Sequence, residues 1–277
     1  MRVEDLEGPR AKPRTARQML EELAWLGFRW EQPVVRQSQR AEHYRNALER
    51  LITAGAAYPC VCSRKDIRIA AHAPHADEAA GAYPGTCRGR FASAREAARA
   101  ANRPFAWRVR TDGKPLVVHD RFAGEHTFRL AETCGDFVIF REGAGAAYQL
   151  AVVVDDCASG VDAIVRGDDL LESAARQAHL RGLLGLGPEP AYWHLPLVVG
   201  PDGRRLAKRH GDTRLSHYRG HGATPERVLG LLGYSCGLLP RRREADLDEL
   251  AGLFDLSRIP REPYVFTAED DAFLRVA

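Results

Sequence analysis

Three of the six cysteines lie close together in the sequence, and their spacing suits a metal-binding site. Cys60 and Cys62 are one residue apart, and Cys87 follows after a stretch rich in alanine, histidine, proline and glycine. Zinc prefers soft sulfur ligands in a tetrahedral arrangement, so three thiolates leave one place for a further ligand. The candidates between the cysteines are His72, His75 and Tyr83. General ligand chemistry favours a histidine, whereas the alternative is that Cys60 and Cys62 are small buried residues without a metal.

A basic loop follows a predicted strand and a turn at residues 201–203. Its positive charges are Arg204, Arg205, Lys208 and Arg209. Such charges on a glycine-flanked loop can neutralise a triphosphate while negative charge develops at its α-phosphorus. Composition alone favours a solvated loop, or a loop that contacts a nucleic-acid backbone.

Polar residues flank two apolar runs in the middle of the chain. These residues are Tyr148, Asp155, Asp156, Arg166 and Asp168. Open α/β sheets bind their ligands where strands end, so these side chains are candidates for one pocket. The guanidinium of Arg166 suits a carboxylate, which it can bind through two parallel hydrogen bonds. An ion-pair network between Arg166 and the aspartates explains the same pattern equally well.

Helical periodicity marks part of the framework that must position these residues. Apolar side chains recur every three or four residues in the segments 15–26, 41–54 and 170–184. A glycine follows each of the first two segments, as is typical at the C-terminus of a helix. A further helical segment begins at Pro225 and opens a helical tail.

Strands are expected between these helices. Short alternating runs between residues 105 and 130 indicate antiparallel strands. The continuous apolar runs 137–140 and 151–154 are typical of strands buried on both faces of a parallel sheet, and 195–199 indicates another short strand. Segment 70–101 has weak periodicity and is expected to be an irregular insertion. Together these elements predict an α/β fold.

Composition limits the class of protein. The chain has 277 residues, of which 45% are hydrophobic, enough to build one elaborated domain or two small ones. A net charge of +3 and a pI near 8.6 are too mild to indicate nucleic-acid binding by themselves. No stretch approaches the roughly 20 apolar residues of a membrane span, and no signal peptide opens the chain, so we expect a cytoplasmic protein with reduced thiols.

Six motifs occur in the order seen in class I enzymes that resemble glutamyl-tRNA synthetase. They are Glu4-Asp5 with Gly8-Pro9-Arg10, Arg36-Gln37-Ser38 before Tyr44, the set Cys60, Cys62, Tyr83 and Cys87, the run from Tyr148 to Asp156, the run from Ile164 to Leu170, and Arg205-Leu206-Ala207-Lys208-Arg209. The chain resembles most closely the glutamyl-queuosine tRNA(Asp) synthetase family, because it stops soon after the basic loop without a large helical anticodon-binding domain. The resemblance covers nearly the whole chain and implies a class I synthetase fold with a Rossmann-like nucleotide-binding core.

The resemblance also implies roles for single residues. Glu4, Tyr148 and Arg166 would line the pocket for L-glutamate, where a carboxylate can hold the substrate ammonium and a guanidinium can hold a substrate carboxylate. Lys208 and Arg205 would contact ATP in a loop that is similar to the "KMSKS" element, and Lys208 would be its catalytic residue. In this chain arginine replaces the first lysine of that element and alanine replaces its serine.

The same resemblance completes the metal site with Tyr83, in place of the histidine that ligand chemistry favours. Cys60, Cys62, Tyr83 and Cys87 would hold one Zn²⁺ ion, and the site would be structural because protein ligands leave no open position for a substrate. Mg²⁺ is expected to accompany ATP. No motif assigns a role to Asp155, Asp156, Cys134, Cys157 or Cys236.

The resemblance divides the chain into four parts. Residues 1–55 would be the remainder of the first half of the catalytic core, 56–130 a zinc-binding and acceptor-like insertion, 131–212 the second half with the basic loop, and 213–277 a short helical tail. The first strand and "HIGH" element of the family would precede Met1, so the core is expected to be truncated at its N-terminus. Either the real product is longer, or the chain is a truncated relative that no longer activates glutamate.

The implied reaction is ATP-dependent activation of L-glutamate to glutamyl-adenylate without tRNA, followed by transfer to the queuosine at the wobble position of tRNA(Asp). A monomer is expected to perform it. Two alternatives stay open, a catalytically silent relative that binds tRNA and a truncated glutamyl-tRNA synthetase that acts on tRNA(Glu). Residues 193–196 either lie near the adenine of ATP or form a packed strand end.

Overall fold

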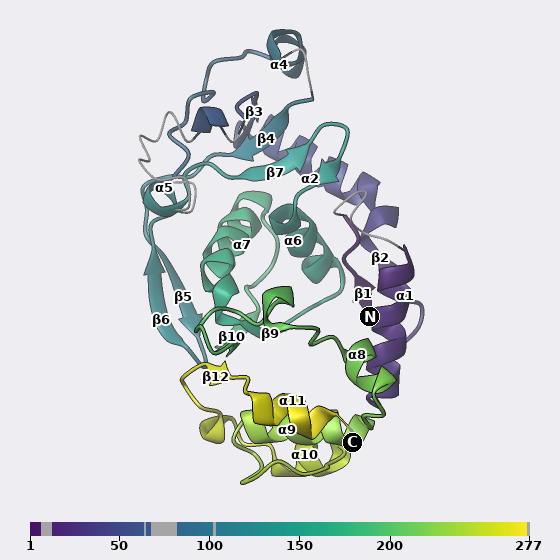
Figure 1. The fold of residues 1–277 in the computed structure, drawn as a ribbon. Coiled ribbons are helices and arrows are strands. Elements are labelled where there is room, and N and C mark those ends of the chain that lie inside the picture. The colour runs from purple at the N-terminus through teal and green to yellow at the C-terminus, as the bar shows by residue number, and fades with distance from the viewer. Residues whose placement is uncertain (7–12, 64, 68–81, 102–103, 276–277) are drawn as a thin grey trace. The chain divides into compact units, whose positions relative to one another are not determined.

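The computed structural model describes residues 1–6, 13–63, 65–67, 82–101 and 104–275. The chain forms two compact units (Figure 1). The larger unit comprises Arg2–Arg10 and Val35–His194, and the smaller unit comprises Met1, Ala11–Val34 and Leu195–Ala277.

The larger unit contains two four-stranded sheets and one short strand pair. The first sheet is antiparallel and has the order β3 (Ala57–Cys60), β4 (Ala106–Val109), β7 (Val138–Arg141) and β8 (Gly145–Ala146). The second sheet has the order β6 (Gly124–Phe128), β5 (Leu116–Asp120), β10 (Ala191–Leu195) and β9 (Ala163–Gly167). In this second sheet β5 and β6 form an antiparallel hairpin, whereas β10 pairs with β5 in parallel. The short pair is parallel and consists of β1 (Arg2–Val3) and β2 (Val35–Arg36).

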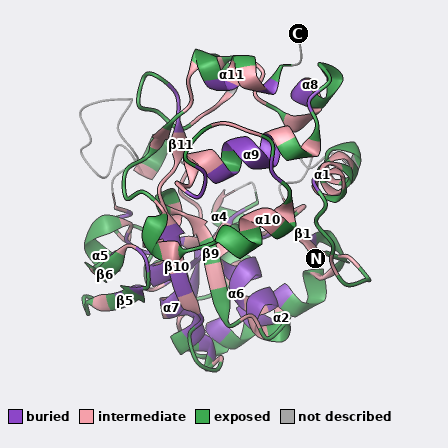
Figure 2. Cartoon of the chain, turned by 90° about the horizontal axis from the view of Figure 1, so that it is seen from below, coloured by how far each residue is buried: buried purple, intermediate pink, exposed green. Residues whose placement is uncertain are grey.

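Helices pack against these sheets and form the core of the larger unit. The long ones are α2 (Ala41–Thr53), α6 (Tyr148–Ala158) and α7 (Leu171–Leu184), and the short ones are η2 (Gln37–Gln39), α4 (Ala94–Ala101), α5 (Leu130–Thr133) and η3 (Asp168–Leu170). Leu48, Leu150 and Leu180, one from each long helix, are fully buried. Buried positions also dominate α6 and α7 in Figure 2.

The smaller unit is mainly helical. Its elements are α1 (Pro13–Trp25), β11 (Val198–Val199), η4 (Lys208–His210), α8 (Leu215–Gly220), α9 (Pro225–Ser235), α10 (Leu247–Leu253), η5 (Leu256–Arg258), β12 (Tyr264–Val265) and α11 (Ala268–Leu274). Thr224 caps α9, whose first residue is a proline, and Thr267 with Asp270 forms a capping box at α11. These local signals explain where both helices begin, and their apolar faces share a second core.

Most of the predicted elements are confirmed. The helices expected at 15–26, 41–54, 170–184 and from Pro225 correspond to α1, α2, α7 and α9. The strands expected between residues 105 and 130 are β4, β5 and β6, and the segment 137–140 overlaps β7. The single strand expected at 195–199 is divided between the end of β10 and β11.

Two expectations about strands are wrong. Residues 151–154 lie in α6, and β7 pairs in antiparallel fashion on both sides rather than in a parallel sheet. Ala151, Val152 and Val153 are all buried, and a helix buried all round has the same continuous apolar sequence as a buried strand. The insertion contains α4, whereas residues 68–81, including His72 and His75, lie outside the described residues.

Candidate functional site

The three clustered cysteines converge in the larger unit. The Sγ atoms of Cys62 and Cys87 are 3.5 Å apart, and those of all three cysteines lie within 4.8 Å of one another. The hydroxyl of Tyr83 lies 3.4 Å from Sγ of Cys60 and 3.8 Å from Sγ of Cys62. Tyr83 reaches this position through a bridge to Gly135, whose φ is +63° and where a Cβ would lie 2.3 Å from the Tyr83 carbonyl oxygen. Only glycine fits at that position.

These distances fit one tetrahedral metal ion. Bonds of about 2.3 Å from zinc to sulfur place two sulfur atoms about 3.8 Å apart, and the shorter bond to oxygen reduces the sulfur–oxygen distance. The sulfur–sulfur separation of 3.5 Å and the sulfur–oxygen separations of 3.4 and 3.8 Å lie within a few tenths of an ångström of this arrangement. The cysteine triad could therefore hold a metal ion, as its spacing in the sequence predicts.

The pKa values in this cluster shift in opposite directions. Burial alone would raise the pKa of Cys87, but hydrogen bonds from the backbone of Val61 and from the Tyr83 hydroxyl outweigh it and lower the pKa, whereas negative charge is unfavourable at Cys62 and Tyr83. Burial raises the pKa of Cys62 to about 12, with a smaller contribution from Cys60. Burial also raises the pKa of Tyr83 far above its usual value, and the contact with Cys60 adds to the effect. The buried guanidinium of Arg108 offers one positive charge, because its Nε lies 3.3 Å from Sγ of Cys60 and its central carbon 3.8 Å from the centre of the Tyr83 ring. A divalent ion would stabilise ionised ligands more strongly.

Asp136 ties together the two segments that carry the cysteines. Its carboxylate accepts hydrogen bonds from the Tyr58 hydroxyl at 2.5 Å, from Nε of Arg88 at 2.8 Å and from the N–H of Thr111 at 2.7 Å. Tyr58 lies in β3, and Arg88 directly follows Cys87. Burial alone would raise the pKa of Asp136, but these bonds outweigh it and hold the pKa below its ordinary value. An ionised carboxylate therefore fixes both segments.

The residues expected to bind glutamate also lie together in the larger unit. Tyr148 is the first residue of α6, Arg166 lies in β9, and Glu4 follows β1. Burial raises the pKa of Tyr148, the charge of Arg166 lowers it and the charge of Glu4 raises it. The phenol therefore lies close to both a cation and an anion.

Hydrogen bonds fix two nitrogen atoms of the Arg166 guanidinium. Nε donates to Nε2 of His194 at 2.9 Å, and Nη1 donates to Oε1 of Gln177 at 3.0 Å. Nη2 is shielded from solvent and has no partner among the described residues. A shielded N–H without an acceptor is costly, and a carboxylate is the acceptor that matches a guanidinium best. Arg166 thus keeps hydrogen-bonding capacity for a ligand.

The neighbouring aspartates have structural contacts instead. Asp155 is buried and accepts hydrogen bonds from Gln37, Arg40 and Tyr44. Asp156 pairs with the arginine of β1 at 2.5 Å, and Asp168 is exposed at the start of η3. The expected ion-pair network between Arg166 and the aspartates is therefore not what the described residues show. Asp155 pairs with Arg40 and Asp156 with Arg2, whereas Arg166 bonds to neutral side chains.

The basic loop lies in the smaller unit. Arg205 forms an antiparallel bridge with β11, and the loop continues into η4. Asp202 accepts a hydrogen bond from a backbone N–H of the turn and lies 2.8 Å from Nε2 of His210. These contacts, the backbone bond first, lower the pKa of Asp202 to about 2. Hydrogen bonds therefore hold the turn that presents the loop at both of its ends. The side chain of Lys208 lies outside the described part of the chain.

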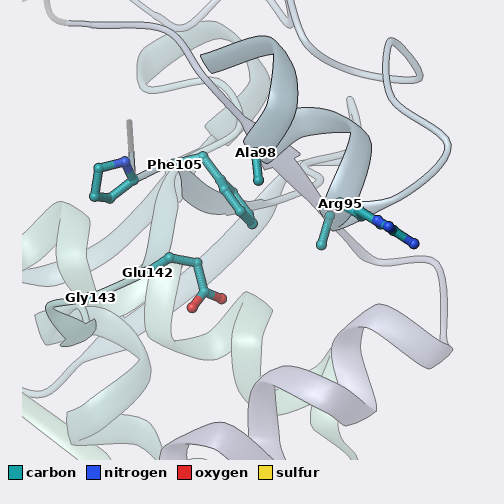
Figure 3. Close-up of a pocket in the computed structure, with 7 residues that line it drawn as sticks. Arg95, Ala98, Phe105, Glu142 and Gly143 are labelled. Carbon is teal, nitrogen blue, oxygen red and sulfur yellow. The ribbon is translucent and has the colours of Figure 1, made fainter. Parts of the chain in front are cut away.

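A pocket of about 610 Å³ lies elsewhere in the larger unit, between α4 and the turn after β7 (Figure 3). It is lined by Ala94, Arg95, Ala98, Pro104, Phe105, Glu142 and Gly143. The Glu142 carboxylate already accepts a hydrogen bond from Trp107 at 2.8 Å and pairs with Arg45 at 3.0 Å. None of the lining residues belongs to a predicted site, so we assign the pocket no chemistry.

Two residues that shape these sites have no role predicted from the sequence. They are Arg108 in β4, beside Cys60, and Asp120 in β5, beside His194. Alternation in β4 and β5 predicts which positions point inward, but it does not reveal which inward polar residue meets a partner far along the chain. For His194 the interpretation as a packed strand end is close to the structure, since the residue is 1% exposed in β10.

No helix among the described residues has both the length and the apolar character needed to cross a bilayer.

Comparisons with known proteins agree with this architecture. The family described as "tRNA synthetases class I (E and Q), catalytic domain" matches residues 1–252. Glutamyl-Q tRNA(Asp) synthetase of Nocardia farcinica is 47% identical over 268 residues, which cover 96% of this chain and 82% of that protein. The protein of the same name from Symbiobacterium thermophilum is 43% identical over 283 aligned residues, with 99% of this chain and 87% of that protein covered.

Solved structures show the same fold. A glutamate tRNA ligase from Elizabethkingia meningosepticum, crystallised with its amino acid, superimposes with a TM-score of 0.77 at 22% identity and covers 99% of this chain. The chain spans 61% of the length of that ligase. The family match and the two bacterial relatives show by sequence to which family the chain belongs. The superposition confirms the expected α/β class I fold. This chain belongs to the glutamyl-Q tRNA(Asp) synthetase family of class I tRNA synthetase catalytic domains.

Proposed function

We propose that the chain activates L-glutamate with ATP and transfers the glutamate to the queuosine at the wobble position of tRNA(Asp). The name shared by its relatives, glutamyl-Q tRNA(Asp) synthetase, supports this donor and acceptor. The observation that carries the proposal is the shielded, unpaired Nη2 of Arg166 close to Tyr148, because a substrate carboxylate would supply the missing acceptor.

In this proposal Glu4, Tyr148 and Arg166 form the glutamate pocket. Arg166 binds a carboxylate of the substrate, and Glu4 binds its ammonium group. A phenol with the ordinary pKa of about 10 is neutral at pH 7, and the pKa of Tyr148 is raised further, so its hydroxyl can donate one hydrogen bond and accept others between the two charged groups. Opposite charges on the protein thereby match the two ends of an amino acid.

The basic loop serves ATP in the same proposal. Lys208, as the catalytic residue, and Arg205 stabilise the phosphate charge, with Mg²⁺ bound to ATP. A carboxylate oxygen of glutamate attacks the α-phosphorus, the bond to pyrophosphate breaks, and glutamyl-adenylate forms. A hydroxyl of the queuosine cyclopentenediol then attacks the acyl carbon, loses its proton and displaces AMP.

The metal site has a structural role in this proposal. Cys60, Cys62, Tyr83 and Cys87 hold one Zn²⁺ ion, which fits the three sulfur ligands and the nearby phenol. The ion orders the insertion and takes part in no chemical step. The division into residues 1–55, 56–130, 131–212 and 213–277, the monomeric state and the cytoplasmic location belong to the same proposal.

Transfer of labelled L-glutamate tests the proposed function. The assay compares tRNA(Asp) that contains queuosine, the same tRNA without queuosine, and tRNA(Glu). We expect ATP-dependent labelling of queuosine-containing tRNA(Asp) alone. Labelling of the 3′ end of tRNA(Glu), with no difference between the two forms of tRNA(Asp), would contradict the proposal.

A further inference from the structure

Two titratable side chains behind Arg166 have no part in the proposed reaction. Asp120 ends β5 and His194 lies in β10, the parallel neighbour of β5 in the same sheet. Both side chains are 0% exposed, and Nδ1 of His194 lies 2.6 Å from Oδ2 of Asp120. Removing both groups from water costs free energy, so a buried pair of this kind is expected to have a structural or functional role.

The hydrogen bonds determine which nitrogen of His194 carries the proton. Asp120 accepts the backbone N–H groups of Phe122 at 2.9 Å and Ala123 at 2.6 Å, and these bonds favour its ionised form. An ionised carboxylate can only accept, so Nδ1 of His194 is the donor. The neutral ring then presents Nε2 as an acceptor, and this atom receives the Nε–H of Arg166 at 2.9 Å.

A second series of hydrogen bonds holds the other side of the guanidinium. Nη1 of Arg166 donates to Oε1 of Gln177, the amide of Gln177 donates to Oε1 of Gln149, and the amide of Gln149 donates to Oγ of Ser173, each at 3.0 Å. Each amide is fixed in one orientation because its oxygen accepts and its nitrogen donates. Two edges of the guanidinium are therefore occupied, and Nη2 is left for a ligand.

We infer that Asp120 and His194 are positioning residues that lock Arg166 with Nη2 presented to the substrate carboxylate. This inference rests on the proposed role of Arg166 in binding glutamate. A guanidinium held on two sides gives up little rotamer freedom when the ligand binds, so the buried pair strengthens binding without touching the substrate. Its loss weakens glutamate binding selectively, while ATP binding and turnover at saturating glutamate change little.

Two substitutions of His194 separate its bonds to Asp120 and to Arg166. In His194→Asn the amide lies near the former Nδ1 and can bond to Asp120, but no acceptor remains near the former Nε2. In His194→Gln the longer side chain places an oxygen near the former Nε2. We expect His194→Asn to raise the KM for L-glutamate about 10-fold to 100-fold with an unchanged KM for ATP, and His194→Gln to restore most of the loss.

Asp120→Asn tests the same link from the other end. Backbone N–H groups hold the amide oxygen at the position of Oδ1, so the amide nitrogen faces Nδ1 of His194. The ring proton then moves to Nε2, where it opposes the Nε–H of Arg166, and the KM for glutamate rises as in His194→Asn. His119→Gln, at an exposed position of the same strand, is the matched control and keeps the wild-type KM.

The measurements are glutamate-dependent exchange of pyrophosphate into ATP, calorimetric titration with L-glutamate, and metal content as a check on folding. Wild-type protein that neither exchanges nor binds glutamate contradicts the proposed function. If the wild type is active but Asp120→Asn and His194→Asn keep its KM for glutamate, the positioning role is overturned. An equal rise of KM for glutamate and ATP, with no rescue by His194→Gln, also overturns it.

Discussion

Two arginines of the larger unit, Arg108 and Arg166, differ in how their hydrogen-bonding capacity is used. Arg108 is buried, donates to Sγ of Cys60 and to a backbone oxygen, and lies over the Tyr83 ring inside a closed cluster. Arg166 is held on two nitrogen atoms by neutral side chains and keeps a shielded Nη2 without a partner in the described residues. The unpaired donor, rather than burial of an arginine, marks the place for a ligand.

The comparison separates two kinds of effect. Changes at the cysteine cluster should alter metal binding and stability, because its groups face one another. Changes around Arg166 should alter affinity for glutamate, because its Nη2 has no hydrogen-bond partner among the described residues. Each substitution below therefore has one region as its target and the other as an internal control.

The largest effect is expected for Cys87→Ser. Loss of one sulfur from the triad should reduce metal affinity by more than the roughly 10-fold to 100-fold that loss of an outer contact costs. Metal content measured by atomic absorption should fall from one ion per chain to nearly none, with a lower unfolding temperature. Cys236→Ser, at a partly buried cysteine of the smaller unit, should keep the metal. Full metal content in the Cys87 variant would show that the cluster is not the site.

A slightly smaller effect is expected for Arg166→Leu. Removing one partner of a desolvated charge pair costs roughly 2–5 kcal/mol, so affinity for L-glutamate should fall about 30-fold to several thousand-fold. Calorimetric titration measures this loss, and metal content should stay unchanged. Arg110→Leu, which removes an exposed bond to a backbone oxygen, is the matched control. Equal glutamate affinity of the two variants would refute the role of the unpaired donor.

Asp136→Asn should weaken the support of the cysteine cluster in a pH-dependent way. The groups facing its carboxylate are Arg88, Tyr58 and Thr111, and the net result is a lowered pKa. Because the folded pKa lies below the value of about 3.9 in the unfolded chain, ionisation stabilises the fold above that pH, and the stabilisation is lost as pH falls through the folded pKa. The variant should lose about 3 kcal/mol at neutral pH.

Denaturant unfolding of wild type and Asp136→Asn between about pH 7 and about pH 3 checks this prediction. The difference in unfolding free energy should be constant from pH 7 to about pH 5 and should shrink below about pH 4. A difference that does not change with pH would mean that the ionised carboxylate is not the source of the stability.

The smallest effect is expected for Arg108→Gln. This change removes a positive charge beside Cys60 and Tyr83 but leaves every sulfur in place. Metal affinity should fall about 10-fold to 100-fold, as for other groups that contact metal ligands, and binding at saturation should still reach one ion. Competition with a chelator measures the affinity, with Arg129→Gln, which removes an exposed bond to a backbone oxygen, as control. An unchanged metal affinity would mean that Arg108 only packs against the cluster and does not stabilise its ionised ligands.

Local chemistry could be predicted from the sequence better than distant pairing. Cys60 and Cys62 are close in sequence, and like Cys87 they offer a thiolate as a metal ligand, so the convergence of the three could be predicted from the sequence. Asp120 and His194 are 74 residues apart, and no periodic pattern shows that one strand lies beside the other. The prediction of a strand at 151–154 was wrong for another reason, because a fully apolar sequence is compatible with a buried helix as well as with a buried strand.

Exchange of labelled pyrophosphate into ATP, measured with limiting L-glutamate and without tRNA, tests whether the chain activates glutamate through Arg166. We expect exchange that requires L-glutamate, proceeds in the absence of tRNA and falls at least about 30-fold in Arg166→Leu, in a protein that keeps its metal. Folded, metal-loaded protein that shows no glutamate-dependent exchange, or exchange that survives Arg166→Leu unchanged, would contradict this expectation.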